Sequence, residues 1–312
     1  MNVSERISYE LEFIKQNPIF VLSNENDVAK IVDVYINNYD EFTIVYKEET
    51  FKHYDSLYRI YNKVKETNTK VLISSATSTD NYLFVHPLVN LYFWQGSNHK
   101  KYINWNSETI DWFDKNYYID FEKNNKGILS VRKQTIIRDR LFSKINNFDG
   151  IIRYASWAKY DGDETPDLLE TTYTFPSILE LIEEYRKSYI SFVVETHTAE
   201  ITNQLSDKTI FSFLTKTMPI VYGGSNYIKE LKDMGFYVWN DEFGFEDGDI
   251  LHQSSELKQY KFVQCIEKFN SLSTNEVKQL YNDNKDKIEK NFELIKVVLE
   301  DNSWWKKNVI DI

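Results

Sequence analysis

The chain has almost no cysteine: Cys265 is the only one among 312 residues. A single cysteine excludes an intramolecular disulfide and a cluster of thiolate metal ligands, and it suits a reducing compartment. Residues 1–16 are amphipathic and charged and lack the apolar core of a signal peptide. No run approaches the ~18 apolar residues of a transmembrane helix. These absences predict a soluble protein of the cytoplasm.

The motifs of several common enzyme classes are also missing. The sequence contains no GxGxxG, no GxxxxGKS/T and no GxSxG, so dinucleotide-dependent dehydrogenases, P-loop NTPases and the usual α/β-hydrolases are not indicated. The five histidines show no HxxxH spacing, and no cysteine cluster supports them as metal ligands. A formal net charge of −11 argues against a protein whose main task is to grip nucleic-acid phosphates, although a local basic cleft is compatible with it.

The apolar content is high enough for two hydrophobic cores. Hydrophobic residues make up 42% of the chain and glycine and proline number only nine and five, which excludes a low-complexity or disordered chain. The length fits two domains of ordinary size. A polar run at Glu122–Gly127 separates two apolar parts. We therefore expect one domain over residues 1–122 and another over residues 128–312.

Strand-like and helix-like patterns alternate in both parts, which is typical of α/β sandwiches. In residues 1–122 the expected strands are Ile19–Leu22, Thr43–Tyr46, Lys70–Ser74 and Tyr82–Val85, with helices over 1–16, Val28–Asn37 and His53–Glu66. In the second part the expected elements include strands at Ile128–Val131 and Ile151–Tyr154, and helices at Ile136–Ile145, Ser177–Tyr185, Leu257–Asn270 and, long and charged, from Asn275 to about Glu300.

The most informative stretch is Ser191–Asp241, where short β-branched runs alternate with helical periodicity. It predicts strand, helix, strand, helix and strand over Phe192–Val194, Ser206–Lys216, Met218–Tyr222, Tyr227–Met234 and Phe236–Trp239. Ser206 is the expected N-cap of the first helix, with Asp207 in its first turn. Such spacing is that of the doubly wound unit, whose ligands bind beyond the carboxyl ends of the strands.

Cationic residues gather at the predicted strand ends of the second domain. Arg132 follows its first strand, Arg138 and Arg140 open the next helix, and Lys208 begins a helix of the central stretch. Backbone N–H groups at a helix N-terminus, together with a lysine or arginine, form an anion site that usually takes diphosphate. The alternatives are that Arg138, Arg140 and Lys144 form a solvated helical face and that Lys208 has a pairing or capping partner at the surface.

Acidic residues give two further signals. Glu195 ends an apolar strand, where a buried carboxylate needs a donor such as a ribose hydroxyl or a backbone amide; the alternative is that it caps the next helix. The triplets Asp161–Asp163 and Asp247–Asp249 fit either a divalent metal site or Asp-Gly turns. Because both lie in polar loops, the turn interpretation is favoured and no metal ligand is assigned.

The central stretch combines a strand ending in Glu195 with the runs Ser206–Thr209, Met218–Val221, Gly223 and Leu231–Phe236. In this order and spacing, these motifs resemble the C-terminal donor-binding domain of GT-B glycosyltransferases, above all α-1,3-fucosyltransferase-like enzymes and related bacterial and phage glycosyltransferases. Asp207 stands where that family more often has Glu. The segment Ser130-Val131-Arg132, followed by Arg138, is similar to the basic opening of that domain. The resemblance covers about Ile128–Asp249.

The resemblance implies a GT-B-like fold, with two Rossmann-like doubly wound domains that face a cleft and a C-terminal helix that returns toward the N-terminal domain. It implies a glycosyltransferase that uses a nucleotide diphosphate sugar as co-substrate, without cofactor or metal, and glycosylates a hydroxyl of a glycan or small molecule. Lys208, with Arg132 or Arg138, would neutralise the departing diphosphate. Residues 1–122 would form the acceptor side.

The same resemblance assigns the remaining donor-binding residues. Glu195 and Asp207 would bind ribose or sugar hydroxyls, Thr209 would donate to phosphate, and Ser206 and Gly223 belong to the same set. The acceptor hydroxyl needs a general base from the first domain. The candidates there are Glu25, Asp27, Asp80 and His86, of which Asp80, in a polar loop after a strand, is favoured.

Two other functions stay open. A phage-type enzyme that glycosylates hydroxymethylated DNA bases would need a basic acceptor groove, and the first domain is less acidic than the whole chain. DNA is thus a conceivable acceptor but not the favoured one. A non-catalytic module that only binds nucleotide sugars is the other alternative.

Overall fold

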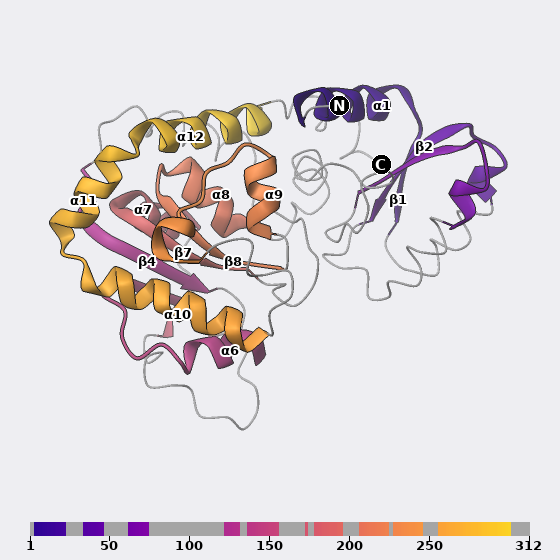
Figure 1. Ribbon diagram of the computed structural model, residues 1–312. Helices are drawn as coiled ribbons and strands as arrows, with labels where there is room; N and C mark the ends of the chain where they lie inside the picture. The colour runs from indigo at the N-terminus through magenta and orange to yellow at the C-terminus, as the bar shows by residue number, and fades with distance from the viewer. Residues whose placement is uncertain are drawn as a thin grey trace. The chain divides into compact units, whose positions relative to one another are not determined.

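The computed structural model describes residues 3–22, 34–46, 62–74, 122–131, 136–155, 172–173, 178–195, 206–224, 227–245 and 255–300. The chain divides into two compact units. Unit 1 comprises Met1–Thr109, Ile201–Leu205 and Val298–Ile312, and unit 2 comprises Ile110–Glu200 and Ser206–Val297. Each unit combines helices with a parallel sheet (Figure 1). The expected α/β class is therefore confirmed.

Unit 1 is described through helix α1, short helical stretches at 34–36 and 62–65, and a small parallel sheet. Helix α1 (Val3–Gln16) stops before Asn17-Pro18, because proline has no N–H with which to continue it. Strands β1 (Ile19–Leu22), β2 (Glu41–Tyr46) and β3 (Lys70–Ser74) pair in that order and run parallel. Three expected strands are thus confirmed, and the fourth, Tyr82–Val85, lies outside the described residues.

The sheet of unit 2 is parallel and doubly wound. Its strands are β4 (Asn125–Val131), β5 (Ile151–Ala155), β6 (Thr172–Tyr173), β7 (Ser188–Val194) and β8 (Met218–Tyr222). Their spatial order is β6-β5-β4-β7-β8, so the chain starts at β4, runs outward to β6 and then returns past β4 to β7 and β8. The order therefore reverses between β4 and β7, and this switch point is where doubly wound sheets bind ligands.

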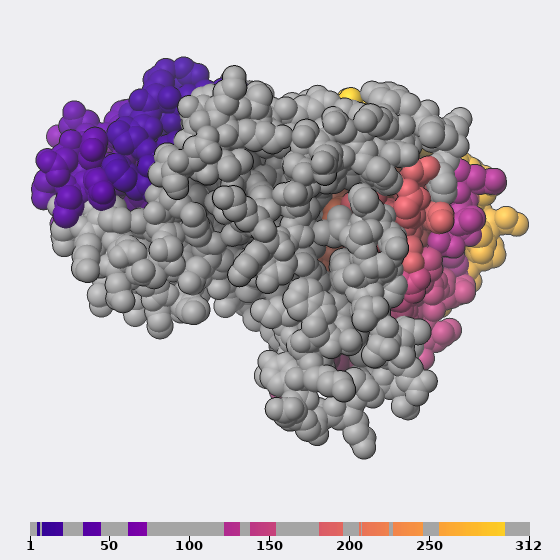
Figure 2. All heavy atoms as spheres, turned by 180° about the vertical axis from the view of Figure 1, so that it is seen from behind, coloured from indigo at the N-terminus to yellow at the C-terminus, as the bar shows by residue number. Residues whose placement is uncertain are grey.

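Helices cover both faces of this sheet (Figure 1). They are α6 (Ile136–Phe142), α7 (Ile178–Lys187), α8 (Asp207–Leu214), α9 (Tyr227–Asp233), α10 (Ser255–Ser271), α11 (Thr274–Asp283) and α12 (Lys285–Glu300). On one face, the Phe192 ring of β7 packs against Phe262 and Phe269 of α10, with ring centroids 5.8 and 5.1 Å apart. On the other, Ser191 of β7 bonds Ser212 of α8. From behind, the magenta residues around β4 lie beside the yellow C-terminal helices (Figure 2).

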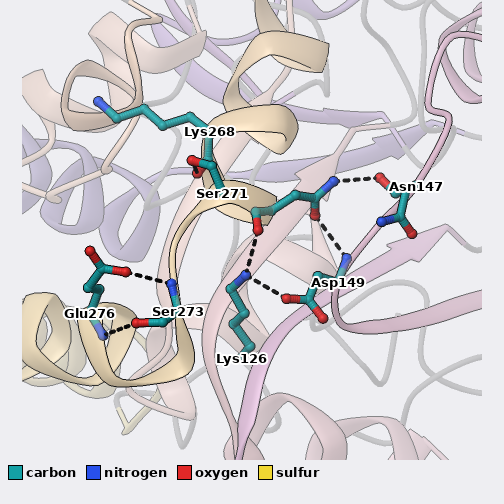
Figure 3. Close-up of polar contacts among 8 residues, drawn as sticks. Lys126, Asn147, Asp149, Lys268, Ser271, Ser273 and Glu276 are labelled. Atoms are coloured by element: carbon teal, nitrogen blue, oxygen red, sulfur yellow. Dashed lines mark hydrogen bonds and ion pairs between the residues drawn. The ribbon is translucent and has the colours of Figure 1, made fainter.

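Polar contacts from the end of α10 close the amino ends of β4 and β5 (Figure 3). Lys126 Nζ donates to Asp149 Oδ2 at 2.6 Å and to the carbonyl oxygen of Asn270 at 3.2 Å. The Asn270 side chain accepts from the Asp149 N–H at 2.9 Å and donates to the Asn147 carbonyl at 2.8 Å. β4 thus begins at Asn125, inside the polar run that was expected to mark the domain boundary.

The prediction of one long helix from Asn275 to about Glu300 is wrong in one respect, because the segment forms two helices. Helix α11 ends at Asp283, and Asn284 adopts φ −112° and ψ 14° before α12 begins at Lys285. The Asn284 side chain donates to the Leu280 carbonyl at 2.9 Å and so satisfies a group at the end of α11. An asparagine that bonds local backbone in this way competes with the helix ladder. None of the described helices is long and apolar enough to span a membrane.

The expected strand at Phe236–Trp239 is also wrong. This segment forms no strand. One backbone bond joins it to β8, from the Trp239 N–H to the Pro219 carbonyl at 2.9 Å. Pro219 cannot donate in return, which interrupts a ladder on that edge. The Asn240 amide replaces the missing pairing, since it accepts from the Val221 N–H at 3.0 Å and donates to the Val221 carbonyl at 2.8 Å.

Candidate functional site

The candidate site lies at the carboxyl ends of β4 and β7, the switch point of the unit 2 sheet. Arg138 from α6 reaches it from the β4 side and is 0% exposed. Its Nη2 donates to the carbonyl oxygen of Val194, the last residue of β7, at 2.7 Å. Arg138 therefore does not lie on a solvated helical face, whereas Arg140 and Lys144 of the same region are exposed. The structure brings one predicted cation to the end of the predicted strand.

The first turn of α8 contributes the second cation. Ser206 occupies the expected N-cap position with φ −78° and ψ 164°, but its side chain makes no capping hydrogen bond. Asp207 is the first residue of the helix. Lys208 follows and is only 4% exposed, so it does not lie at the surface. A buried lysine in the first turn adds its charge to the positive end of the helix dipole.

A buried carboxylate lies between β7, α8 and α9. Glu195 is 4% exposed, and its Oε1 accepts from Thr209 Oγ1 at 2.6 Å and from Tyr227 Oη at 2.8 Å. The two hydroxyl oxygens are 2.9 Å apart. Glu195 N–H also donates to the Tyr222 carbonyl at 2.9 Å, which extends the pairing of β7 with β8. We call Glu195, Thr209 and Tyr227 the Glu195 triad.

The protonation of the Glu195 triad follows from its burial. Desolvation, and then the nearby charge of Glu195, raise the pKa of Tyr227 well above its usual value near 10. The phenol therefore stays protonated and donates, while the carboxylate accepts. Glu195 Oε1 thus accepts from the hydroxyl of Thr209 in the structure, whereas the resemblance assigned both residues to binding the nucleotide sugar.

The turn between β8 and α9 is built around Gly223. A Cβ at this position would lie 2.6 Å from Cγ and 2.8 Å from Cβ of Tyr227, so only glycine lets the tyrosine approach. Lys258 of α10 donates from Nζ to the carbonyl oxygens of Gly223 and Gly224, the latter at 3.0 Å. Gly223 therefore supports the Glu195 triad through packing, and Lys258 anchors the turn that contains it.

Sequence reasoning missed Tyr227 and Lys258. Tyr227 carried a signal, because a tyrosine that opens a helix directly after a Gly-Gly turn lies at a strand's carboxyl end. The signal for Lys258 was weaker. Lys258 lies one helical turn before Phe262, on the same apolar face of the helix as Phe269, and a lysine on an apolar helix face needs a buried partner.

Two predicted site residues, Asp80 and Arg132, lie outside the described residues. The same is true of Glu25, Asp27 and His86, the other candidates for the general base, and of both DGD triplets. For Asp207 the backbone is described and the side chain is not. Within the described ranges, no three His, Cys, Asp or Glu side chains gather as a metal ion would require.

No protein-family model, no curated protein and no solved structure matches the chain. The strand order of unit 2 and the side chains at its switch point are therefore the features from which a function can be inferred.

Proposed function

We propose that unit 2 binds the diphosphate of a nucleotide sugar at the carboxyl ends of β4 and β7. One observation carries this proposal: two buried cations, Arg138 and Lys208, lie where the strand order of a doubly wound sheet reverses. Cationic side chains beside the first turn of a helix, at the carboxyl ends of parallel strands, are groups that commonly bind phosphate.

The chemistry of the site suits a diphosphate that becomes a leaving group. The Ser206 side chain does not cap the N–H groups at the start of α8. Lys208 in that first turn adds a full charge to these dipoles. Fixed donors and charges of this kind stabilise negative charge as it develops, and they do so without a metal ion.

We further propose that the chain is a glycosyltransferase that transfers the sugar to a hydroxyl of a glycan or a small molecule. Its two units would form the two halves of a GT-B-like enzyme, with the acceptor on the side of residues 1–122 and Asp80 as general base. Arg132 would assist Lys208 at the diphosphate. The motif order from Glu195 to Gly235 supports this step.

A thermal-shift screen with GDP, UDP, CDP and ADP tests the binding step. A ligand at 100 times its Kd stabilises the native state by about 2.7 kcal/mol, which is readily detected as a higher melting temperature. We expect at least one nucleotide to raise the melting temperature of the wild type. If none of the four does, the donor site is rejected.

A variant pair then locates the site. Lys208→Ala should abolish the nucleotide-dependent shift and leave the melting temperature of the free protein within a few degrees of the wild type. Lys229→Ala is the control, because Lys229 forms an exposed pair with Asp233 on α9, and exposed pairs contribute little to stability. Equal shifts in both variants would remove Lys208 from the site. Binding without turnover of any nucleotide sugar would identify a binding module instead of an enzyme.

A further inference from the structure

Lys258 lies at the carboxyl end of β8 although it belongs to α10. It is 6% exposed, and its Nζ donates to the carbonyl oxygens of Gly223 and Gly224. The same Nζ lies 5.1 Å from the ring centroid of Tyr222, the last residue of β8. A helix that covers one face of the sheet therefore extends a cation to the turn that follows the edge strand.

The turn held by Lys258 is linked to the Glu195 triad. The Gly224 carbonyl also accepts from the Tyr227 N–H at 3.3 Å, and Gly223 packs against the Tyr227 ring. Tyr227 then donates its hydroxyl to Glu195. Backbone carbonyls, an aromatic ring and a carboxylate thus form one continuous path from α10 to the end of β7.

We propose that Lys258 is a positioning residue of the candidate site, which fixes the β8–α9 turn and, through Tyr227, orients Glu195 and Thr209. Its effect on nucleotide affinity depends on the function proposed above, whereas its effect on the turn does not. Without the Nζ, two buried carbonyl oxygens would lose a shared donor, and an unsatisfied buried group is costly. The turn would then relax and take Tyr227 with it.

The protonation of Lys258 provides a direct probe. Burial lowers the pKa of this ammonium to about 8. Among the described residues, the Tyr222 ring of β8 lies 5.1 Å from this Nζ, and burial raises the pKa of the Tyr222 phenol to about 12. The pKa of an exposed lysine is about 10.4. Between about pH 8 and about pH 10.4, opening the turn would therefore add a proton to Lys258, so a rising pH favours the closed turn.

Glycine carbonyl NMR measures this titration at the turn itself. Gly223-Gly224 is the only Gly-Gly pair in the sequence. Labelling with glycine that carries ¹³C at the carbonyl and ¹⁵N therefore assigns the Gly223 carbonyl through its coupling to the next nitrogen. We expect this signal to titrate in the wild type with a midpoint near pH 8. No titration in the folded wild type would overturn the proposal.

Three variants complete the test. Lys258→Met removes the charge at similar length and should abolish the titration, while Lys258→Arg, which stays protonated, should show none in this range and keep the Gly223 signal near its low-pH position. Lys268→Met is the control, because Lys268 on the same helix donates to one carbonyl, that of Glu242, and is exposed. It should titrate as the wild type does. A failure of Lys258→Met to fold leaves the wild type and Lys258→Arg to decide.

Nucleotide affinity separates positioning from simple stability. For the nucleotide that shifts the wild type, we expect Lys258→Met to raise Kd at least tenfold at pH 7, Lys258→Arg to restore it to within threefold, and Lys268→Met to leave it unchanged. Wild-type affinity in Lys258→Met would overturn the positioning role even if the carbonyl titrates. If the wild type binds none of the four nucleotides, the proposed function fails, and the carbonyl titration still decides whether Lys258 fixes the turn.

Discussion

The Glu195 triad makes a quantitative prediction, because two hydroxyls donate to one carboxylate oxygen. Thr209→Val and Tyr227→Phe each remove one donor and leave the shape of the side chain nearly unchanged. After either substitution Glu195 Oε1 keeps the other donor, at 2.6 or 2.8 Å in the wild type. After both, a buried oxygen of a carboxylate that is 4% exposed loses both hydroxyl donors.

The expected magnitudes follow from this geometry. A hydrogen bond to a charged group contributes about 1.5–3 kcal/mol, so each single variant should lower the free energy of unfolding by about 2 kcal/mol. The double variant should lose more than the sum, with a coupling energy of about 1–2 kcal/mol, because only it leaves the carboxylate oxygen without either hydroxyl. Urea denaturation at pH 7 measures all four proteins. Thr215→Val is the control, since Thr215 of the same region donates to a neutral carbonyl, that of Phe211.

The pH dependence of the same variants gives a second check. The folded-state pKa of Tyr227 is raised above the unfolded value near 10. Its contribution to stability is therefore complete below pH 10 and is lost as the pH rises further, by about 1.4 kcal/mol per pH unit. Tyr222, with a pKa raised to about 12, adds a similar loss. Tyr227→Phe should show a shallower alkaline decline than the wild type.

Additive effects would refute this reasoning. If the double variant equals the sum of the singles within about 0.5 kcal/mol, the two hydroxyls do not share an acceptor. An unchanged alkaline slope in Tyr227→Phe would show that the phenol is not buried against a carboxylate.

Three further perturbations test other parts of unit 2. Gly223→Ala should cost about 1–3 kcal/mol, because its Cβ would lie 2.6 Å from Cγ of Tyr227; equal denaturation midpoints would contradict that packing. Lys123→Met should cost about 3 kcal/mol in urea denaturation, because Lys123 Nζ donates to three backbone carbonyls at 2.7, 2.9 and 3.2 Å. Asn240→Ala removes both bonds to Val221 and should cost about 2 kcal/mol, whereas Asn240→Asp sets a buried carboxylate against the Val221 carbonyl oxygen and should cost at least as much; calorimetry showing wild-type stability for either variant would oppose this.

Local chemistry determined much of what the sequence predicted. The strand Met218–Tyr222 was predicted with the bounds that the structure has. The reason is that this apolar run has Pro219 near its start and is followed directly by Gly223-Gly224, which ends a strand. The start of α8 after Ser206, and the position of Lys208 in its first turn, followed from N-cap preference and helical periodicity. Such signals act over a few residues, so one sequence is enough to show them.

Local signals were insufficient where a long-range contact decided the outcome. The Phe236–Trp239 run looks like a strand, but the residue opposite it is Pro219, and only the fold shows that pairing. In the sequence, Asn284 looks like an ordinary position in one long charged helix. The bond from its side chain to the Leu280 carbonyl, which accompanies the break, is visible only in the structure.

The candidate site shows the same division. The sequence predicted that Glu195 ends a strand and that Thr209 and Lys208 begin the helix after it. It also predicted cationic residues at the carboxyl ends of the strands of the same domain. The tertiary structure alone decided that Glu195 bonds Tyr227, 32 residues away, that Arg138 is buried at the end of β7, and that Lys258 holds the turn from a helix 35 residues downstream. The physical reason is that burial and pairing depend on which elements pack together, and many distant residues set that jointly.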